Sequence, residues 1–198
     1  MIPHNERKEL DKGQSSEELW ESLCEGNRKA LNQLFRLFYE PLYDYGIKLV
    51  SDPEVVKDGI QKLFLRLWKR REALSQAQSV KAYLLFSLRR ILLRIKKSHK
   101  TRIKRNKHYL DKTFSRSFST EEIVIEKELE REKKEKLLEA INALNGRQKE
   151  ALFLRYYHGL SNGEIAHVMD INRQSVRNHL SRALKSLRTL LYGMPWID

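Results

Sequence analysis

The chain has 198 residues, with 39 lysines and arginines against 26 acids and a formal net charge of +13. This excess makes a polyanion the expected partner, and nucleic acid is favoured over a membrane surface. The single cysteine, Cys24, excludes an intramolecular disulfide framework and a multi-cysteine zinc site. No apolar run approaches the roughly 18 residues of a membrane span, and the N-terminus lacks the apolar segment of a signal peptide. We therefore expect a cytoplasmic protein without membrane insertion.

Few prolines and glycines, and little strict alternation of apolar and polar residues, predict an all-α fold. Residues 1–16 are polar and are expected to be disordered. Four amphipathic segments then occupy 17–97, the third of them opened by Asp52 as cap and Pro53 in the first turn. We expect these segments to form one small helical domain.

The composition changes over 98–127, where basic residues dominate and core-forming residues become sparse. This composition predicts a flexible basic linker. Helical periodicity returns over 128–191, which we expect to form a second small helical domain, and 192–198 is expected to be a loosely attached tail. Asn145 and Gly146 predict a turn inside the second domain, followed by a single helix from Arg147 to Tyr157 that ends at Gly159.

The second domain ends in a pattern typical of a helix-turn-helix, between Leu160 and Leu187. Ser161 and Glu164 form a capping box that predicts a short helix from residue 162 or 163. Asn172 can cap a longer helix that begins at Arg173. One stripe of apolar residues follows on that helix: Val176, Leu180, Ala183, Leu184 and Leu187.

The outward face of this last helix is basic and amide-bearing and contains no acid. It carries Arg173, Gln174, Arg177, Asn178, His179, Ser181, Arg182 and Lys185. Arginine, asparagine and glutamine can make paired hydrogen bonds to guanine or adenine in the major groove. A helical hairpin with a merely solvated face is the alternative, but solvated faces usually mix both signs of charge. The pattern therefore predicts DNA binding.

A second basic cluster lies in the fourth amphipathic segment, from Val80 to about Lys97. Its second half carries Arg89, Arg90, Arg94, Lys96 and Lys97, and aromatic residues are interleaved before them. Cations that follow phosphates and rings that stack on bases are typical of single-strand binding. Cations that only complement the helix dipole are the alternative, but five in nine residues exceed that need.

Five separate stretches then match one known family in order. They are Gly26-Asn27, the FRLFYEPLYDYG of the second helix, the pattern of Asp58, Gln61, Phe64 and Trp68, the KAYL of Lys81–Leu84, and LSNGEIAHVMDINRQSVRNHLSRAL. The chain resembles a bacterial RNA polymerase sigma factor of the extracytoplasmic-function (ECF) type, over about Leu19–Lys97 and Glu128–Leu191. That family has sigma domain two and sigma domain four joined by a linker. KAYL and LWKRRE are most similar to the sigma factors abundant in Bacteroidetes.

The resemblance implies three contact sets. Core polymerase would be bound at the clamp helices of its largest subunit by Asp58 and Gln61. The nontemplate strand of the minus-ten element would be melted and held by the loop Ser75–Ser79 and by Lys81, Tyr83, Arg89 and Arg90. The minus-thirty-five element would be read by Arg173, Gln174, Ser175, Arg177 and Asn178, with Arg182 and Lys185 on phosphates. An anti-sigma factor is a further expected partner, and no cofactor or metal is implied.

The chain departs from the family pattern in its charges. Lys62 stands where an acid usually follows the glutamine, and Arg90 and Arg94 replace an asparagine and an acid of the fourth helix. These extra cations should strengthen phosphate attraction and its salt dependence. A free-standing helix-turn-helix regulator is the alternative function. We do not expect an enzyme. The histidines are not spaced as in a metal-binding helix, and the sequence has neither a glycine-rich phosphate loop nor a serine elbow.

Overall fold

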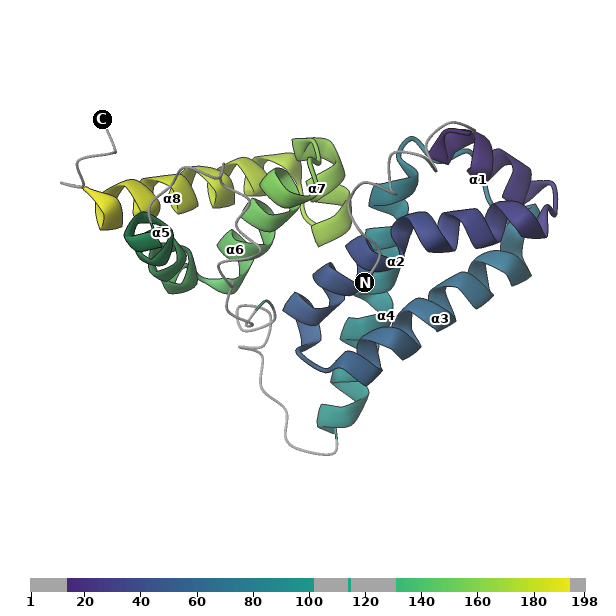
Figure 1. Ribbon diagram of the computed structural model, residues 1–198, viewed down its shortest axis with the longest axis horizontal. Helices are drawn as coiled ribbons and strands as arrows, with labels where there is room; N and C mark the ends of the chain where they lie inside the picture. The colour runs from purple at the N-terminus through teal and green to yellow at the C-terminus, as the bar shows by residue number, and fades with distance from the viewer. Residues whose placement is uncertain (1–13, 102–113, 115–130, 193–198) are drawn as a thin grey trace.

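The structure is a computed structural model that describes residues 14–101, 114 and 131–192. Its described part is all-helical, as the sequence predicted, and contains no strand. The helices are α1 (Ser16–Cys24), α2 (Arg28–Val50), α3 (Pro53–Arg70), α4 (Val80–Thr101), α5 (Arg131–Ala143), α6 (Gly146–Leu152), α7 (Asn162–Met169) and α8 (Arg173–Leu191). We call α1–α4 the N-terminal bundle and α5–α8 the C-terminal bundle. The two bundles lie side by side and meet where α7 adjoins α4 (Figure 1).

The helices of the N-terminal bundle begin at side-chain caps. Ser15 and Glu18 form a capping box that starts α1 one residue before the expected Glu17. Asn27 Oδ1 accepts a hydrogen bond from Lys29 N at 2.9 Å to start α2, and Asp52 caps α3 as predicted. Continuing four residues past Lys97, α4 ends at Thr101. Most of the predicted linker, and residues 1–13 and 193–198, lie outside the described residues.

Two glycines allow the helices of the N-terminal bundle to cross closely. A Cβ atom built on Gly46 of α2 would lie 2.7 Å from Val56 Cγ1 of α3. A Cβ atom on Gly59 of α3 would lie 2.7 Å from Leu92 Cδ2 of α4. Only a residue without a side chain fits both crossings. Gly46 thereby lets α2 approach α3, and Gly59 lets α3 approach α4, so the helices that carry the predicted polymerase and minus-ten residues pack closely.

The C-terminal bundle is interrupted by a π-helical turn. A single helix was predicted over 147–157, but α6 ends at Leu152 and a π-helical turn follows at Phe153–Tyr157. Arg155 Nη1 donates to the carbonyl of Leu160 at 3.0 Å, which ties the turn to the entry of α7. The wider turn presents Tyr157 and His158 toward the N-terminal bundle, where both make contacts.

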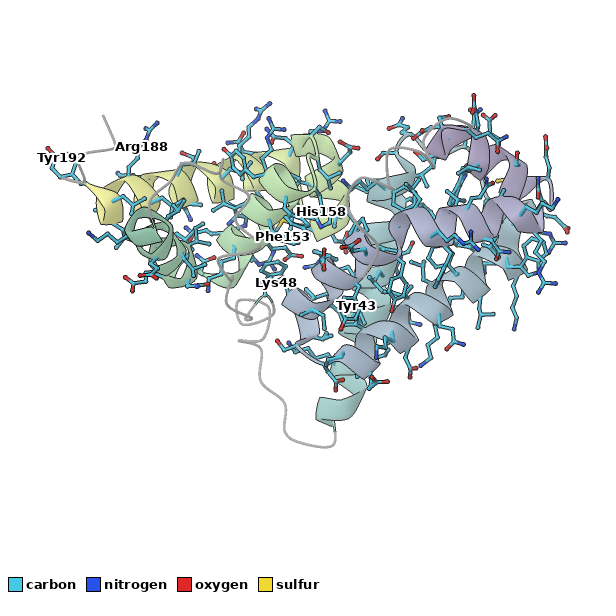
Figure 2. All side chains as sticks on the ribbon, in the orientation of Figure 1. Tyr43, Lys48, Phe153, His158, Arg188 and Tyr192 are labelled. Atoms are coloured by element: carbon cyan, nitrogen blue, oxygen red, sulfur yellow. The ribbon has the colours of Figure 1, made fainter. Side chains whose placement is uncertain are left out.

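The apolar core is continuous across the junction of the two bundles. Phe114, the one described residue between α4 and α5, is 1% exposed. Its ring centroid lies 6.2 Å from that of Tyr45 in α2 and 5.7 Å from that of Phe153. The labelled Phe153, His158 and Lys48 lie at this junction, whereas Arg188 and Tyr192 lie at the far end of α8 (Figure 2). The two predicted helical units are therefore packed on one another.

Candidate nucleic-acid interface

The helix-turn-helix has the caps that the sequence predicted. Glu164 N donates to Ser161 Oγ at 3.3 Å, and Glu164 Oε2 accepts from Ser161 N at 2.8 Å. At the end of α7 the chain turns through Asp170, whose φ is 56°. Asn172 Oδ1 then accepts from Ser175 N at 2.7 Å, which starts α8. These local bonds fix where α7 and α8 begin, and the turn between them is three residues long.

Helix α8 is buried along one side only. Val176 and Ala183 are fully buried, and Ala166 of α7 is 7% exposed. The opposite side carries six exposed residues of the predicted minus-thirty-five set: Arg173, Gln174, Arg177, Asn178, Arg182 and Lys185. Ser175 is half-buried. Gln174 Nε2 donates to Asn178 Oδ1 at 3.1 Å, so two amides are held together on the exposed face of the first turns. The arrangement can present donors and acceptors to base edges.

The four predicted minus-ten residues of α4 differ in how exposed they are. Arg90 is exposed, and its guanidinium carbon lies 5.4 Å from the centre of the Phe86 ring. Tyr83 is half-buried, edge-on to Trp20 at 4.9 Å between ring centroids. Lys81 is also half-buried and Arg89 is 7% exposed, because both contact the C-terminal bundle. Among these four residues, only Arg90 is on an open surface.

The loop between α3 and α4 is held in place by α1. Trp20 Nε1 donates to the carbonyl of Ser75 at 3.0 Å, and Trp20 itself is 2% exposed. At the other end of the loop, Ala82 N donates to Ser79 Oγ at 3.2 Å. A buried indole from the first helix thus positions the backbone of the loop that the resemblance assigns to strand melting.

A groove of about 500 Å³ lies between α3 and α4 beside this loop. Its lining combines cations and aromatic rings: Arg66, Arg70, Tyr83, Phe86, Arg90 and Arg94. Cations with rings between them suit a single strand, whose phosphates and bases they can contact at once. Arg66 and Arg70 were not predicted to belong to the minus-ten set. Their spacing of four on α3 puts both on one helix face and was the available signal.

The predicted polymerase-binding residues also lie on α3. Asp58 and Gln61 are both exposed, as the resemblance requires of residues that contact another protein. Lys62, the departure from the family pattern, is exposed beside them. Leu65 of the same helix is 53% exposed, which adds apolar surface to this face. The face can therefore offer both polar and apolar contacts to a partner.

One acid at the junction was not singled out from the sequence. Glu150 of α6 is 2% exposed, and its Oε1 atom accepts from Arg89 Nε at 2.8 Å and from Tyr45 Oη at 2.7 Å. Burial opposes the charge on Arg89, but the carboxylate of Glu150 outweighs it and the pKa of Arg89 is raised. Burial raises the pKa of Tyr45, so its hydroxyl keeps its proton and donates it to Glu150. The position of Glu150 in α6 gave no sign of a partner 61 residues away.

His158 completes the junction as a buried neutral histidine. It is 5% exposed, and burial lowers its pKa to about 3, with the charge of Lys81 adding to the effect. Its Nε2 atom has no hydrogen-bond partner among the described residues. Neither a metal-binding group of histidines, cysteines and acids nor a helix long and apolar enough to cross a membrane is found within the described ranges.

Comparison with known proteins agrees with this geometry. Residues 134–187, which contain α6, α7 and most of α8, match the family model described as sigma-70, region 4. The ECF RNA polymerase sigma factor BldN of Streptomyces coelicolor is 26% identical over 184 residues. That match covers 88% of this chain and 65% of BldN, so the chain spans a little under two thirds of its curated relative. The chain is similar to sigma factors of the extracytoplasmic-function type.

Two solved structures share the fold. The sigma factor RpoE of Bartonella quintana, in complex with the anti-sigma factor NepR, has a TM-score of 0.57 at 21% identity and covers 82% of this chain and 97% of its own. CnrH, in complex with the cytosolic domain of CnrY, has a TM-score of 0.58 at 17% identity and covers 89% of this chain and 97% of its own. At these identities the two structures show a shared fold, and the similarity to ECF sigma factors rests on the region 4 match and on BldN.

Proposed function

We propose that this chain is an ECF-type sigma factor that binds core RNA polymerase, recognises promoter DNA and initiates transcription. The observation that carries the proposal is the cationic, aromatic groove between α3 and α4. A free-standing regulator that reads duplex DNA through α8 needs no such groove on its other bundle. A promoter-opening subunit needs one, because the separated strand must be held once the duplex melts.

Each bundle has its own task in this proposal. The N-terminal bundle acts as sigma domain two, with Asp58 and Gln61 on the polymerase clamp helices. The minus-ten strand is held by four residues of α4: Lys81, Tyr83, Arg89 and Arg90. The C-terminal bundle acts as sigma domain four and reads the minus-thirty-five element through the exposed face of α8. The exposure of Asp58, Gln61 and the α8 residues supports these roles.

The partners and setting follow from the same proposal. The chain works in the cytoplasm with core polymerase and promoter DNA, and it has no catalytic role of its own. An anti-sigma factor is a further proposed partner, since one similar structure is a complex with such a protein. The KAYL and LWKRRE stretches are the basis for proposing the Bacteroidetes subfamily.

Run-off transcription tests the function directly. Core polymerase with the purified chain, on a library of promoter fragments, should give discrete transcripts that polymerase alone does not give. Gel shifts on the same duplexes provide the comparison with a regulator. Strong sequence-specific binding by the chain alone, with no transcripts in the presence of polymerase, would establish the regulator instead.

A further inference from the structure

The closed junction between the bundles occupies residues that the proposed function needs for DNA. Arg89 Nε and Nη2 lie 2.8 and 3.5 Å from Glu150 Oε1 and Oε2, a two-point contact that matches the fork of a guanidinium to a carboxylate. The side chains of the pair are 8% and 2% exposed. A phosphate oxygen pair could take the same position, but not while Glu150 is there.

Three further contacts cover α4 and the loop before it. Lys81 Nζ donates to the carbonyl of His158 at 2.6 Å, so its charge points at the C-terminal bundle. The ring of Phe86, which also lines the groove, lies 4.4 Å from that of His167 between centroids. Ser79 of the loop lies close enough to Glu164 to help lower the pKa of that carboxyl. The contacts come from two parts of the C-terminal bundle, His158 after the π-helical turn and helix α7, and they reach both α4 and the loop before it.

The contact is of a kind that can open. Two charges are taken out of water when the junction closes, and this desolvation offsets most of their mutual attraction. When the bundles separate, both charges are hydrated again and neither is left buried and unpaired. Tyr157 Oη donates to Asp44 Oδ2 at 2.6 Å at the exposed rim, where water can replace the bond. An anion that competes with Glu150 for Arg89 would therefore favour separated bundles, against the apolar contacts that hold them together.

The exposed face of α8 is unaffected by closure. Arg173, Arg177 and Arg182 stay exposed in the same structure that buries Arg89. The closed chain therefore keeps its proposed duplex reader accessible while it covers two of its proposed strand-holding residues, Lys81 and Arg89.

We propose that Glu150 is an intramolecular competitor of DNA: its carboxylate occupies Arg89 in the closed chain, so that closure and the binding of a strand phosphate by Arg89 exclude one another. The proposal rests on the proposed function, because it takes α4 to be the strand-holding helix. Duplex recognition by α8 comes first, and strand capture requires the bundles to separate.

The test uses the full chain and two fluorescein-labelled probes, a 20-nucleotide single strand of mixed sequence and the duplex of the same sequence. Glu150→Gln removes the charge and keeps an oxygen that can accept from Tyr45. We expect it to raise affinity for the single strand tenfold or more and to change affinity for the duplex less than twofold. The radius of gyration from X-ray scattering should rise, since the bundles separate.

Two further variants distinguish competition by Glu150 from a general effect of removing one negative charge. Glu139→Gln makes the same charge change at an exposed position of α5 and should leave both affinities within twofold. Tyr157→Phe weakens the rim of the junction with no change of charge, and should raise single-strand affinity severalfold. Circular dichroism confirms that each variant remains helical, and Tyr157→Phe carries the test if Glu150→Gln does not fold.

The outcomes separate this proposal from the function on which it rests. An unchanged single-strand affinity in Glu150→Gln and Tyr157→Phe overturns the competition, whether or not the chain expands. An equal gain for duplex and single strand, or for Glu139→Gln, also overturns it. If the wild-type chain gives no run-off transcripts with core polymerase, the sigma function is overturned. The radius of gyration is measured without polymerase or DNA, so it still shows whether the junction opens in Glu150→Gln.

Discussion

Acid should open the junction through His158. The buried imidazole has a pKa of about 3, against about 6.5 once it is hydrated. The closed form therefore binds fewer protons, and its stability is lost as the pH falls from about 6.5 toward 3. At pH 5.5, one unit below the hydrated value, protonation favours the open form by about 1.4 kcal/mol, or roughly tenfold.

The surroundings of His158 support this direction of change. Lys81 of α4 is a cation, and its own pKa is lowered by burial. The rings of Tyr45 and Tyr157 lie edge-on to the imidazole, at 6.2 and 5.2 Å between centroids, and burial raises the pKa of Tyr45 so that its phenol stays neutral. None of these three groups can stabilise an imidazolium as a carboxylate would. A charged His158 is thus unfavourable until the bundles part.

Affinity for the 20-nucleotide single strand reports the fraction of chains that are open. If only the open form binds, the apparent affinity falls in proportion to that fraction. Anisotropy at constant ionic strength should show about tenfold tighter binding at pH 5.5 than at pH 7.5. His158→Leu cannot titrate and corrects for the protonation of other groups. If this variant gains affinity on acidification as much as the wild type, His158 is not responsible and the reasoning fails.

Three other changes test the assigned surfaces. Arg177→Ala should lower transcription from a cognate promoter by roughly 10- to 100-fold through a lost base contact, with binding to core polymerase intact; equal loss of both would make α8 structural. The double variant Asp58→Ala and Gln61→Ala should weaken the free energy of binding to core polymerase by about 1–2 kcal/mol, seen as less polymerase in a pull-down, while the melting temperature is unchanged. Gly59→Ala should lower the free energy of unfolding by about 1 kcal/mol, because the clash with Leu92 exceeds the gain in helix propensity; an unchanged or higher melting midpoint would show that Leu92 yields.

Sequence reasoning was most successful where the determinants are local. The capping box of Ser161 and Glu164 and the Asn172 cap each act within three residues, and the structure confirms all of them. The apolar stripe of α8 was likewise predictable for Val176 and Ala183, which are fully buried. A short-range signal is present in the chain itself and needs no knowledge of how the bundles meet.

The junction could not be predicted because its determinants are distant in sequence. Arg89 has the pattern of an exposed cation, and only a partner 61 residues later buries it. The π-helical turn has a related cause. It changes the phase of the chain after Leu152, so the 3.6-residue period that predicted one helix to Tyr157 does not show where His158 points.

Phe114 divides the connection between the bundles into two shorter spans. Thirty chain steps separate Thr101 from Arg131, of which thirteen precede Phe114 and seventeen follow it. The Phe114 ring packs near Tyr45 of the N-terminal bundle and Phe153 of the C-terminal bundle. At about 3.5 Å per residue, thirty steps reach at most about 100 Å, whereas thirteen and seventeen steps reach only about 45 and 60 Å. While the Phe114 ring stays at the junction, the covalent chain alone therefore limits the distance of each bundle from that point more strictly than the full connection would.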